Sequence, residues 1–131
     1  MNGIVTGKQE KQAGSLVWKS LYKYTFTADD YSWTVYLNQH SNLLDLLNNQ
    51  TLYIKLNPAT RTSKPPSYIL GRSIPYASQY LAVPFQVSTG SQDYVTLQWI
   101  NDSVGSLTVK LRNNDNSLNY YLTSIEFGTL E

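Results

Sequence analysis

Residues 95–112, VTLQWINDSVGSLTVKLR, contain two runs in which apolar and polar side chains alternate. In the first run, Val95, Leu97 and Trp99 fall on one side of an extended chain, and polar residues separate them. In the second run, residues 107–112, Leu, Val and Leu alternate with Thr, Lys and Arg. A period of two is typical of a half-buried β-strand. This stretch therefore predicts two strands, each with one face towards water.

The same pattern recurs along most of the chain from residue 16 onward. Short runs rich in aromatic and β-branched residues are separated by Asn, Asp, Gly, Ser and Pro. Further strands are expected at residues 18–26, 33–37, 52–56, 68–72, 81–88 and 120–127. Eight strands at a spacing of roughly 8–12 residues predict an all-β, jelly-roll-like sandwich of antiparallel strands. A small β-barrel is the second choice.

Three local signals refine this expectation. Leucine doublets at residues 42–48 predict one short helix. Pro84 indicates an edge strand or a bulge, because proline cannot donate to a central ladder. The Asn, Asp and Ser side chains of residues 113–117 favour a tight turn, so a hairpin is expected between the last two strands.

The first fifteen residues differ in composition from the rest. Residues 1–15 mix glycine with charged and amide side chains and contain few large apolar groups. We expect them to form a flexible lead-in or linker, followed by a single β-sandwich domain over residues 16–131.

Composition excludes several classes of function. The 131 residues include ten basic and nine acidic side chains, one histidine and no cysteine. Thiol chemistry, thiolate metal sites and histidine-rich metal sites are therefore excluded, and no cofactor is expected. A net charge of +1 without clustered basic residues argues against nucleic acid as a partner. Neither an apolar run of roughly 20 residues nor the apolar core of an export signal is present, so membrane insertion is not expected.

Catalysis finds little support in the sequence. A serine–histidine–carboxylate arrangement would have to combine His40 with Ser41 and Asp45, yet no Gly-x-Ser-x-Gly motif is present. The acidic residues are scattered, and the adjacent pair Asp29 and Asp30 fits a solvated turn better than an acid–base couple. We therefore expect no enzymatic activity.

The most unusual feature of the composition is its aromatic residues. Eleven tyrosines and three tryptophans accompany only three phenylalanines, so most rings carry a polar group. Trp33 and Trp99 are in register with apolar neighbours and are assigned to the core. Tyrosine rings beside planar polar groups can stack on a pyranose and bind its hydroxyls, although tyrosines also serve ordinary cross-strand pairing. The candidate loop-borne ligand residues, strongest between 68 and 80, are Tyr31, Tyr68, Arg72, Tyr76, Tyr80, Asp93 and Tyr94.

Residues 119–128, NYYLTSIEFG, add a final strand to a surface rich in Asn, Ser, Thr and Tyr. With the all-β pattern and the absence of cysteine, the chain resembles the receptor-binding or carbohydrate-binding domains at the tips of tailed-phage adhesion devices. The resemblance implies a compact sandwich, commonly trimeric in fibres, that binds host cell-wall saccharides without cleaving them. It also implies a location at the tail tip of the virion, among other tail proteins, and a connection through residues 1–15 to a longer tail protein or a neighbouring module. A complete small protein is the alternative. No site residue is transferred from the family.

Three functions therefore compete. The first is a non-enzymatic saccharide-binding domain of a phage tail, and the second is a structural or protein-interaction β-domain of a virion or cell-surface assembly, because tyrosine is enriched at interfaces as well. A glycosidase or esterase is the third. Binding to a glycan array would separate the first from the second, and hydrolysis of a bound glycan would favour the third.

Overall fold

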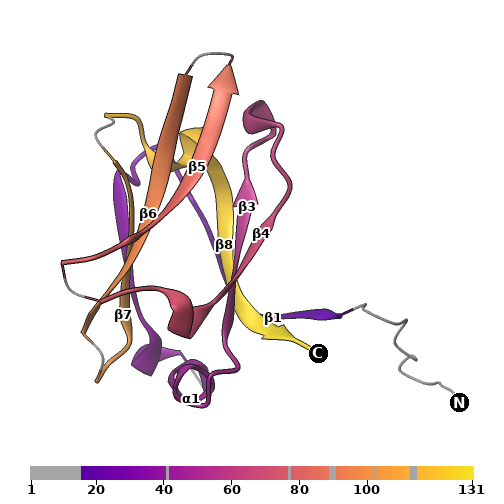
Figure 1. Ribbon diagram of the computed structural model, residues 1–131, viewed down its shortest axis with the longest axis vertical. Helices are drawn as coiled ribbons and strands as arrows, with labels where there is room; N and C mark the ends of the chain where they lie inside the picture. Colours follow the sequence, from indigo (N-terminus) through magenta and orange to yellow (C-terminus); the bar gives the residue numbers. More distant parts are fainter. Residues whose placement is uncertain (1–15, 41, 77, 89–90, 102, 113–114) are drawn as a thin grey trace, which may run out of the picture.

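The computed structural model describes residues 16–131 except for positions 41, 77, 89–90, 102 and 113–114. Two four-stranded antiparallel sheets pack face to face in the described chain (Figure 1). The strands are β1 (Trp18–Thr25), β2 (Ser32–Tyr36), β3 (Tyr53–Pro58), β4 (Ser67–Leu70), β5 (Leu81–Ser88), β6 (Ser91–Asn101), β7 (Ser106–Leu111) and β8 (Leu122–Leu130). The expected all-β sandwich of eight strands is confirmed.

Helical structure is limited to short segments. The leucine doublets form α1 (Leu43–Asn48), as the sequence predicted. The remaining helical turns are the 3-10 segments η1 (Leu37–Gln39), η2 (Thr60–Thr62), η3 (Gly71–Ser73) and η4 (Leu118–Tyr120).

The strand order links the beginning of the chain to its end. Sheet A has the order β1-β8-β3-β4, and sheet B has the order β2-β7-β6-β5. The first two strands thus pair with the last two, as in a jelly roll, while β3–β4 and β5–β6 are local antiparallel pairs. Each sheet keeps two edge strands, so the alternative of a closed barrel is wrong.

The expected hairpin at residues 113–117 is also wrong. β7 belongs to sheet B and β8 to sheet A, so the chain crosses from one sheet to the other between them. Leu118 is fully buried at this crossing, and its amide donates to the carbonyl of Asp30 at 2.6 Å. Burial of this apolar side chain at the end of the core favours a crossing over a return within the same sheet.

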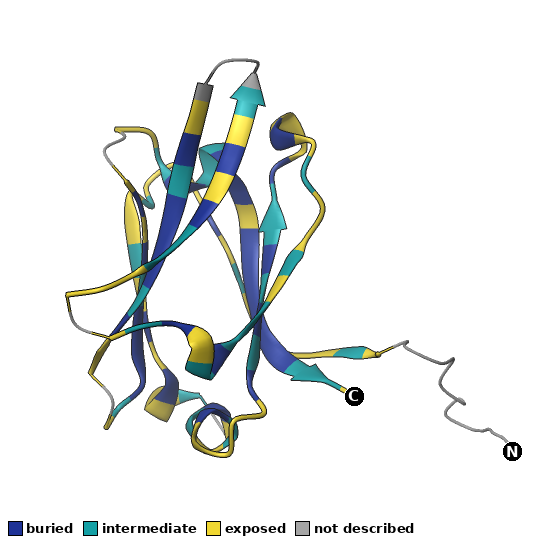
Figure 2. Ribbon diagram, viewed as in Figure 1, coloured by how far each residue is buried: buried dark blue, intermediate teal, exposed yellow. Residues whose placement is uncertain are grey.

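The core lies between the two sheets (Figure 2). Val95, Leu97 and Trp99 are fully buried on the inner face of β6, as their alternation predicted. Trp99 also satisfies its polar atom, because its indole N–H donates to the carbonyl of Gly71 at 2.9 Å. Trp33 is half-buried and stacks on Tyr24 with ring centroids 4.9 Å apart, so both tryptophans pack in the structure as expected.

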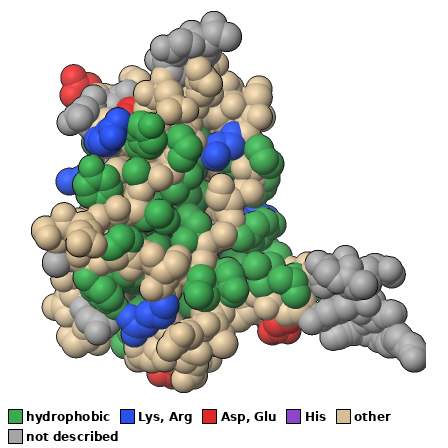
Figure 3. Space-filling view, viewed as in Figure 1, with side chains coloured by type: hydrophobic (Ala, Val, Ile, Leu, Met, Phe, Trp, Pro, Cys, Tyr) green, Lys and Arg blue, Asp and Glu red, His purple; other side chains and the backbone are tan. Residues whose placement is uncertain are grey.

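The edge strands β4 and β5 border one side of the sandwich. β5, which contains Pro84, is an edge strand of sheet B, as expected for a strand with proline. In Figure 3, hydrophobic side chains fill the middle of the view, where Figure 1 shows the space between the edge strands β4 and β5.

The first strand pairs irregularly with β8. Its pairing with β8 shifts between Ser20 and Tyr22, so Leu21 is the extra residue of a bulge. A Cβ atom on Gly128 would come within 1.9 Å of the carbonyl oxygen of Lys19. The main chain of β1 therefore approaches β8 most closely at the one position where β8 has no side chain.

Candidate functional site

A groove of about 330 Å³ lies on the outer face of sheet B. Its lining residues are Tyr80, Thr96, Gln98, Lys110, Leu111 and Arg112. This volume is at the lower end of the roughly 300–1,000 Å³ of ligand pockets. We call it the sheet-B groove.

The register of β6 and β7 places these side chains. Thr96 pairs with Lys110, and both alternate with inward-facing neighbours, so they stand on the outer face. Gln98 pairs with Thr108 one step along the same face. The polar faces that the sequence predicted for these strands thus form the floor of the groove.

An aromatic ring stands at the side of the groove. Tyr80 precedes β5, and 49% of its surface is exposed. The side-chain amide of Gln98 donates to the carbonyl of Gln79 at 2.8 Å, which ties the segment before β5 to the sheet. The ring is therefore accessible and attached to a fixed framework.

Two cations line the groove next to a second ring. The guanidinium of Arg112 lies 4.1 Å from the ring centroid of Tyr94, and its backbone amide donates to the carbonyl of Tyr94 at 3.0 Å. The Tyr94 hydroxyl accepts a hydrogen bond from Gln92 at 3.0 Å. Stacking on the ring holds the planar guanidinium in place. Among the described residues, neither Lys110 nor Arg112 forms an ion pair with a carboxylate.

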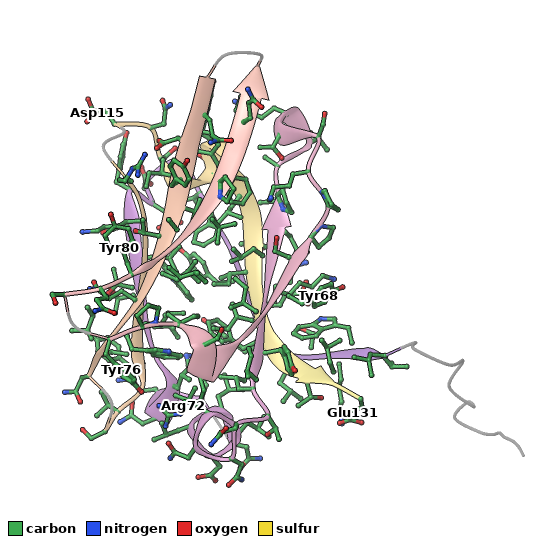
Figure 4. The ribbon with its side chains drawn as sticks, viewed as in Figure 1. Tyr68, Arg72, Tyr76, Tyr80, Asp115 and Glu131 are labelled. Carbon is green, nitrogen blue, oxygen red and sulfur yellow. The ribbon has the colours of Figure 1, made fainter. Side chains whose placement is uncertain are left out.

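The structure divides the predicted ligand residues between several places (Figure 4). Tyr80 lines the groove, and Tyr94 borders it through Arg112. Arg72 and Tyr76 lie together near α1, where Arg72 donates to the Tyr76 hydroxyl and, at 2.8 Å, to the side chain of Asn48. They are joined to each other and to α1.

Tyr31 and Tyr68 stand apart from that groove lining. Tyr31 precedes β2 and is 60% exposed. Tyr68 lies in β4 on the outer face of sheet A, and Figure 4 shows it on the opposite side of the sandwich from Tyr80. Residues 68–80 therefore do not form one site.

Asp93 differs from its predicted role. It lies in β6 rather than in a loop, is only 9% exposed, and continues the inward-facing series that ends at Trp99. One carboxylate oxygen accepts the amide of Tyr94 at 2.8 Å, and the other has no hydrogen-bond partner among the described residues. β6 begins at Ser91, so extending the alternation one step before Val95 would have identified this position.

Apart from Leu111, four polar groove residues were missing from the sequence-based candidates: Thr96, Gln98, Lys110 and Arg112. The sequence did indicate that these four side chains face solvent, because all four belong to the polar faces of the alternating runs in residues 95–112. What the sequence did not show was that β6 and β7 are neighbours in register.

A second polar cluster lies on the outer face of sheet A. Glu126 is nearly buried and accepts hydrogen bonds from the indole of Trp18 at 3.1 Å and the amide of Asn57 at 2.7 Å. Lys55 lies 3.8 Å from the same carboxylate and over the rings of Trp18 and Tyr68, at 5.9 and 5.4 Å. The hydrogen bonds and the ion pair leave the buried carboxylate with partners from this cluster, which is typical of a structural role.

Burial alone raises the pKa of Glu126. Hydrogen bonds from Asn57, Ser20 and Trp18 lower it, and so does the positive charge of Lys55. Their combined effect is larger, so the pKa lies below the ordinary value for this side chain.

His40 lies in a separate pocket of about 210 Å³ that Asp45 also lines. The imidazole packs on the ring of Tyr22 with centroids 4.0 Å apart. No hydrogen bond joins His40 to Asp45 in the described part of the chain, and Ser41 lies outside it. Over the same residues, no group of three or more His, Cys, Asp and Glu side chains could hold a metal ion.

None of the helices in the described ranges is long and apolar enough to cross a membrane. No protein-family model, curated protein or solved structure matches this chain.

Proposed function

We propose that the chain is a non-enzymatic carbohydrate-binding domain that recognises a host cell-wall saccharide. The observation that carries this proposal is the sheet-B groove, in which an exposed tyrosine ring stands beside the amide of Gln98 on β6 and the guanidinium of Arg112, the residue that follows β7. Rigid strands hold such groups more accurately than loops do.

The chemistry of the groove fits a sugar ring. A pyranose has an apolar face of axial hydrogens and a rim of hydroxyl groups. The ring of Tyr80 can cover the apolar face, while Gln98 and Arg112 offer planar polar groups to the rim. An open groove of this size gives weak binding to one saccharide, and several copies of the domain would multiply the affinity.

The biological setting of the proposal rests on the resemblance described above. We propose that the domain belongs to a receptor-binding or adhesion protein at the tail tip of a phage virion, as one of three copies attached to other tail proteins. The many identical wall saccharides of a host cell would then be bound by several grooves at once.

A structural or protein-interaction domain is the second candidate, and an observation on the first strand favours it. Leu16 and Val17, just before β1, and Leu21, within it, are 60%, 57% and 45% exposed. Exposed apolar side chains in one short segment of the chain suit contact with another protein. The two candidates predict different partners for the isolated domain.

Binding to an array of bacterial wall glycans, followed by titration of the strongest ligand, tests the first candidate. We expect Tyr80→Ala to weaken binding by about 1–3 kcal/mol, by analogy with base stacking on aromatic rings, and to leave the melting temperature nearly unchanged. Tyr68→Ala is the matched control, because it removes an exposed ring from the opposite face.

Two results would contradict the proposal. If Tyr80→Ala binds like the parent while Tyr68→Ala loses binding, the groove is not the site. If no glycan binds and Leu21→Ser abolishes a complex with a tail protein, the second candidate is correct.

A further inference from the structure

We infer that the sheet-B groove selects acidic saccharides, with a carboxylate or phosphate group of the ligand bound between Lys110 and Arg112. This inference rests on the proposed function of the groove and adds the chemical class of its ligand. The argument starts from the charges that surround the groove.

Lys110 and Arg112 stand on the same face of the chain, two residues apart, and both line the groove. Arg112 directly follows β7, and its amide still bonds to Tyr94 of β6. Residues two apart in an extended chain are roughly 7 Å apart, so one anionic group can lie between the two side chains. The whole chain has a net charge of only +1. The positive charge of the groove is therefore local and not the result of a basic protein.

No described carboxylate neutralises these cations. On the neighbouring strand β6, Asp93 is buried on the inner face. Asp30, before β2, accepts hydrogen bonds from Tyr24 and Thr27. Asp115, beyond β7, forms no ion pair within the described residues. The ion pair that those residues do form, Lys55 with Glu126, is in sheet A.

Arg112 is also prepared to bind an anion. Its guanidinium stacks on Tyr94, so little further side-chain freedom is lost when a ligand binds. The stacked guanidinium directs its N–H groups in its own plane, which is the geometry of bidentate bonds to a carboxylate or phosphate. A neutral sugar would leave both cations without a counter-charge.

Calorimetric titration with paired probes tests this inference. The first pair is trigalacturonate and its neutral methyl ester, and the second pair is glucose 6-phosphate and glucose. We expect at least one acidic probe to bind about tenfold more tightly than its neutral partner, as charge-assisted hydrogen bonds allow. The preferred pair identifies the anion as carboxylate or phosphate.

Variants connect the preference to the two cations. Lys110→Gln and Arg112→Gln should each reduce the ratio of acidic to neutral affinity several-fold, and 0.5 M salt should reduce it as well. Lys23→Gln is the matched control, because it removes an exposed cation from β1 in sheet A and should leave the ratio unchanged.

The outcomes separate this inference from the proposed function. Equal binding within both pairs, with Tyr80→Ala weakening all of it, would overturn the acidic preference and support saccharide binding. The same conclusion follows if neither acidic probe binds at millimolar concentration while a neutral wall saccharide does. If no saccharide binds, both the inference and the proposed function fail.

Discussion

Trp99 fills the centre of the core, and its one polar atom is bonded to the carbonyl of Gly71. Replacing it with alanine leaves a large cavity and removes one of the two hydrogen bonds to that carbonyl, which also accepts the amide of Ile74. Trp99→Ala should therefore lower the free energy of unfolding by about 3–5 kcal/mol. Urea unfolding followed by circular dichroism measures this difference. Ile100→Ala, at a neighbouring position that is 55% exposed, is the control and should change stability by less than about 0.5 kcal/mol. Equal losses in both variants would contradict the assigned core position.

Glu126 makes stability depend on pH. Its folded-state pKa lies below the ordinary value of 4.5, because hydrogen bonds and Lys55 outweigh the effect of burial. Between these two pKa values the unfolded chain binds more protons, so stability rises with pH. The contribution is fully present above about pH 5 and is lost as pH falls through the folded-state pKa.

Glu126→Gln should therefore be less stable than the parent at pH 7, and the difference should shrink at pH 3. Urea midpoints measured from pH 3 to pH 7 test this expectation. Glu131→Gln, which changes an exposed carboxylate near the end of β8, is the control. A constant difference between Glu126→Gln and the parent across this range would contradict the linkage.

At the scale of one element, the close approach of β1 to β8 depends on Gly128. A methyl group there would collide with the main chain of Lys19, which cannot move as a flexible side chain can. Gly128→Ala should destabilise the protein by about 3 kcal/mol, at the upper end of overpacking, and separate Trp18 from Tyr68. Urea unfolding and tryptophan fluorescence measure the two effects.

Thr129→Ala changes the next residue of β8 and is the matched control for Gly128→Ala. It should leave both stability and fluorescence near those of the parent. An unchanged free energy of unfolding in Gly128→Ala would mean that β1 does not require this close approach.

The strands themselves could be predicted because alternation is a local property. Residues 95–112 predicted β6, β7 and their buried faces, and Pro84 predicted an edge strand. The crossing between β7 and β8 could not be predicted, because polar turn residues indicate only that a strand ends. The partners of β8 are set by pairing with β1 and β3, far away in the sequence.

The candidate site shows the same limit. Tyr80 and Tyr94 could be selected from the sequence, because an aromatic ring beside polar residues is a local signal. Lys110 and Arg112 looked like the ordinary polar face of one strand. Only the pairing of β7 with β6 brings them beside Gln98 and Tyr80.

For the whole molecule, the pairing of residue 17 with residue 131 at one end of the β1–β8 pair decides how the domain responds to force. The amide of Val17 donates to the carbonyl of Glu131 at 2.8 Å, and the amide of Glu131 donates back at 3.0 Å. A force that pulls residues 17 and 131 apart therefore loads the hydrogen bonds of this pair one after another. A force between residues 25 and 131 acts on opposite ends of the same pair and loads these bonds together.

Single-molecule pulling can compare the two directions, because the chain has no cysteine and introduced cysteine pairs would be its only thiols. We expect handles at residues 17 and 131 to open the domain at a clearly lower force than handles at 25 and 131. Equal forces would contradict the sequential opening. A domain held through residues 17 and 131 would thus yield first by peeling β1 from β8, while sheet B, which carries the groove, would remain folded at that step.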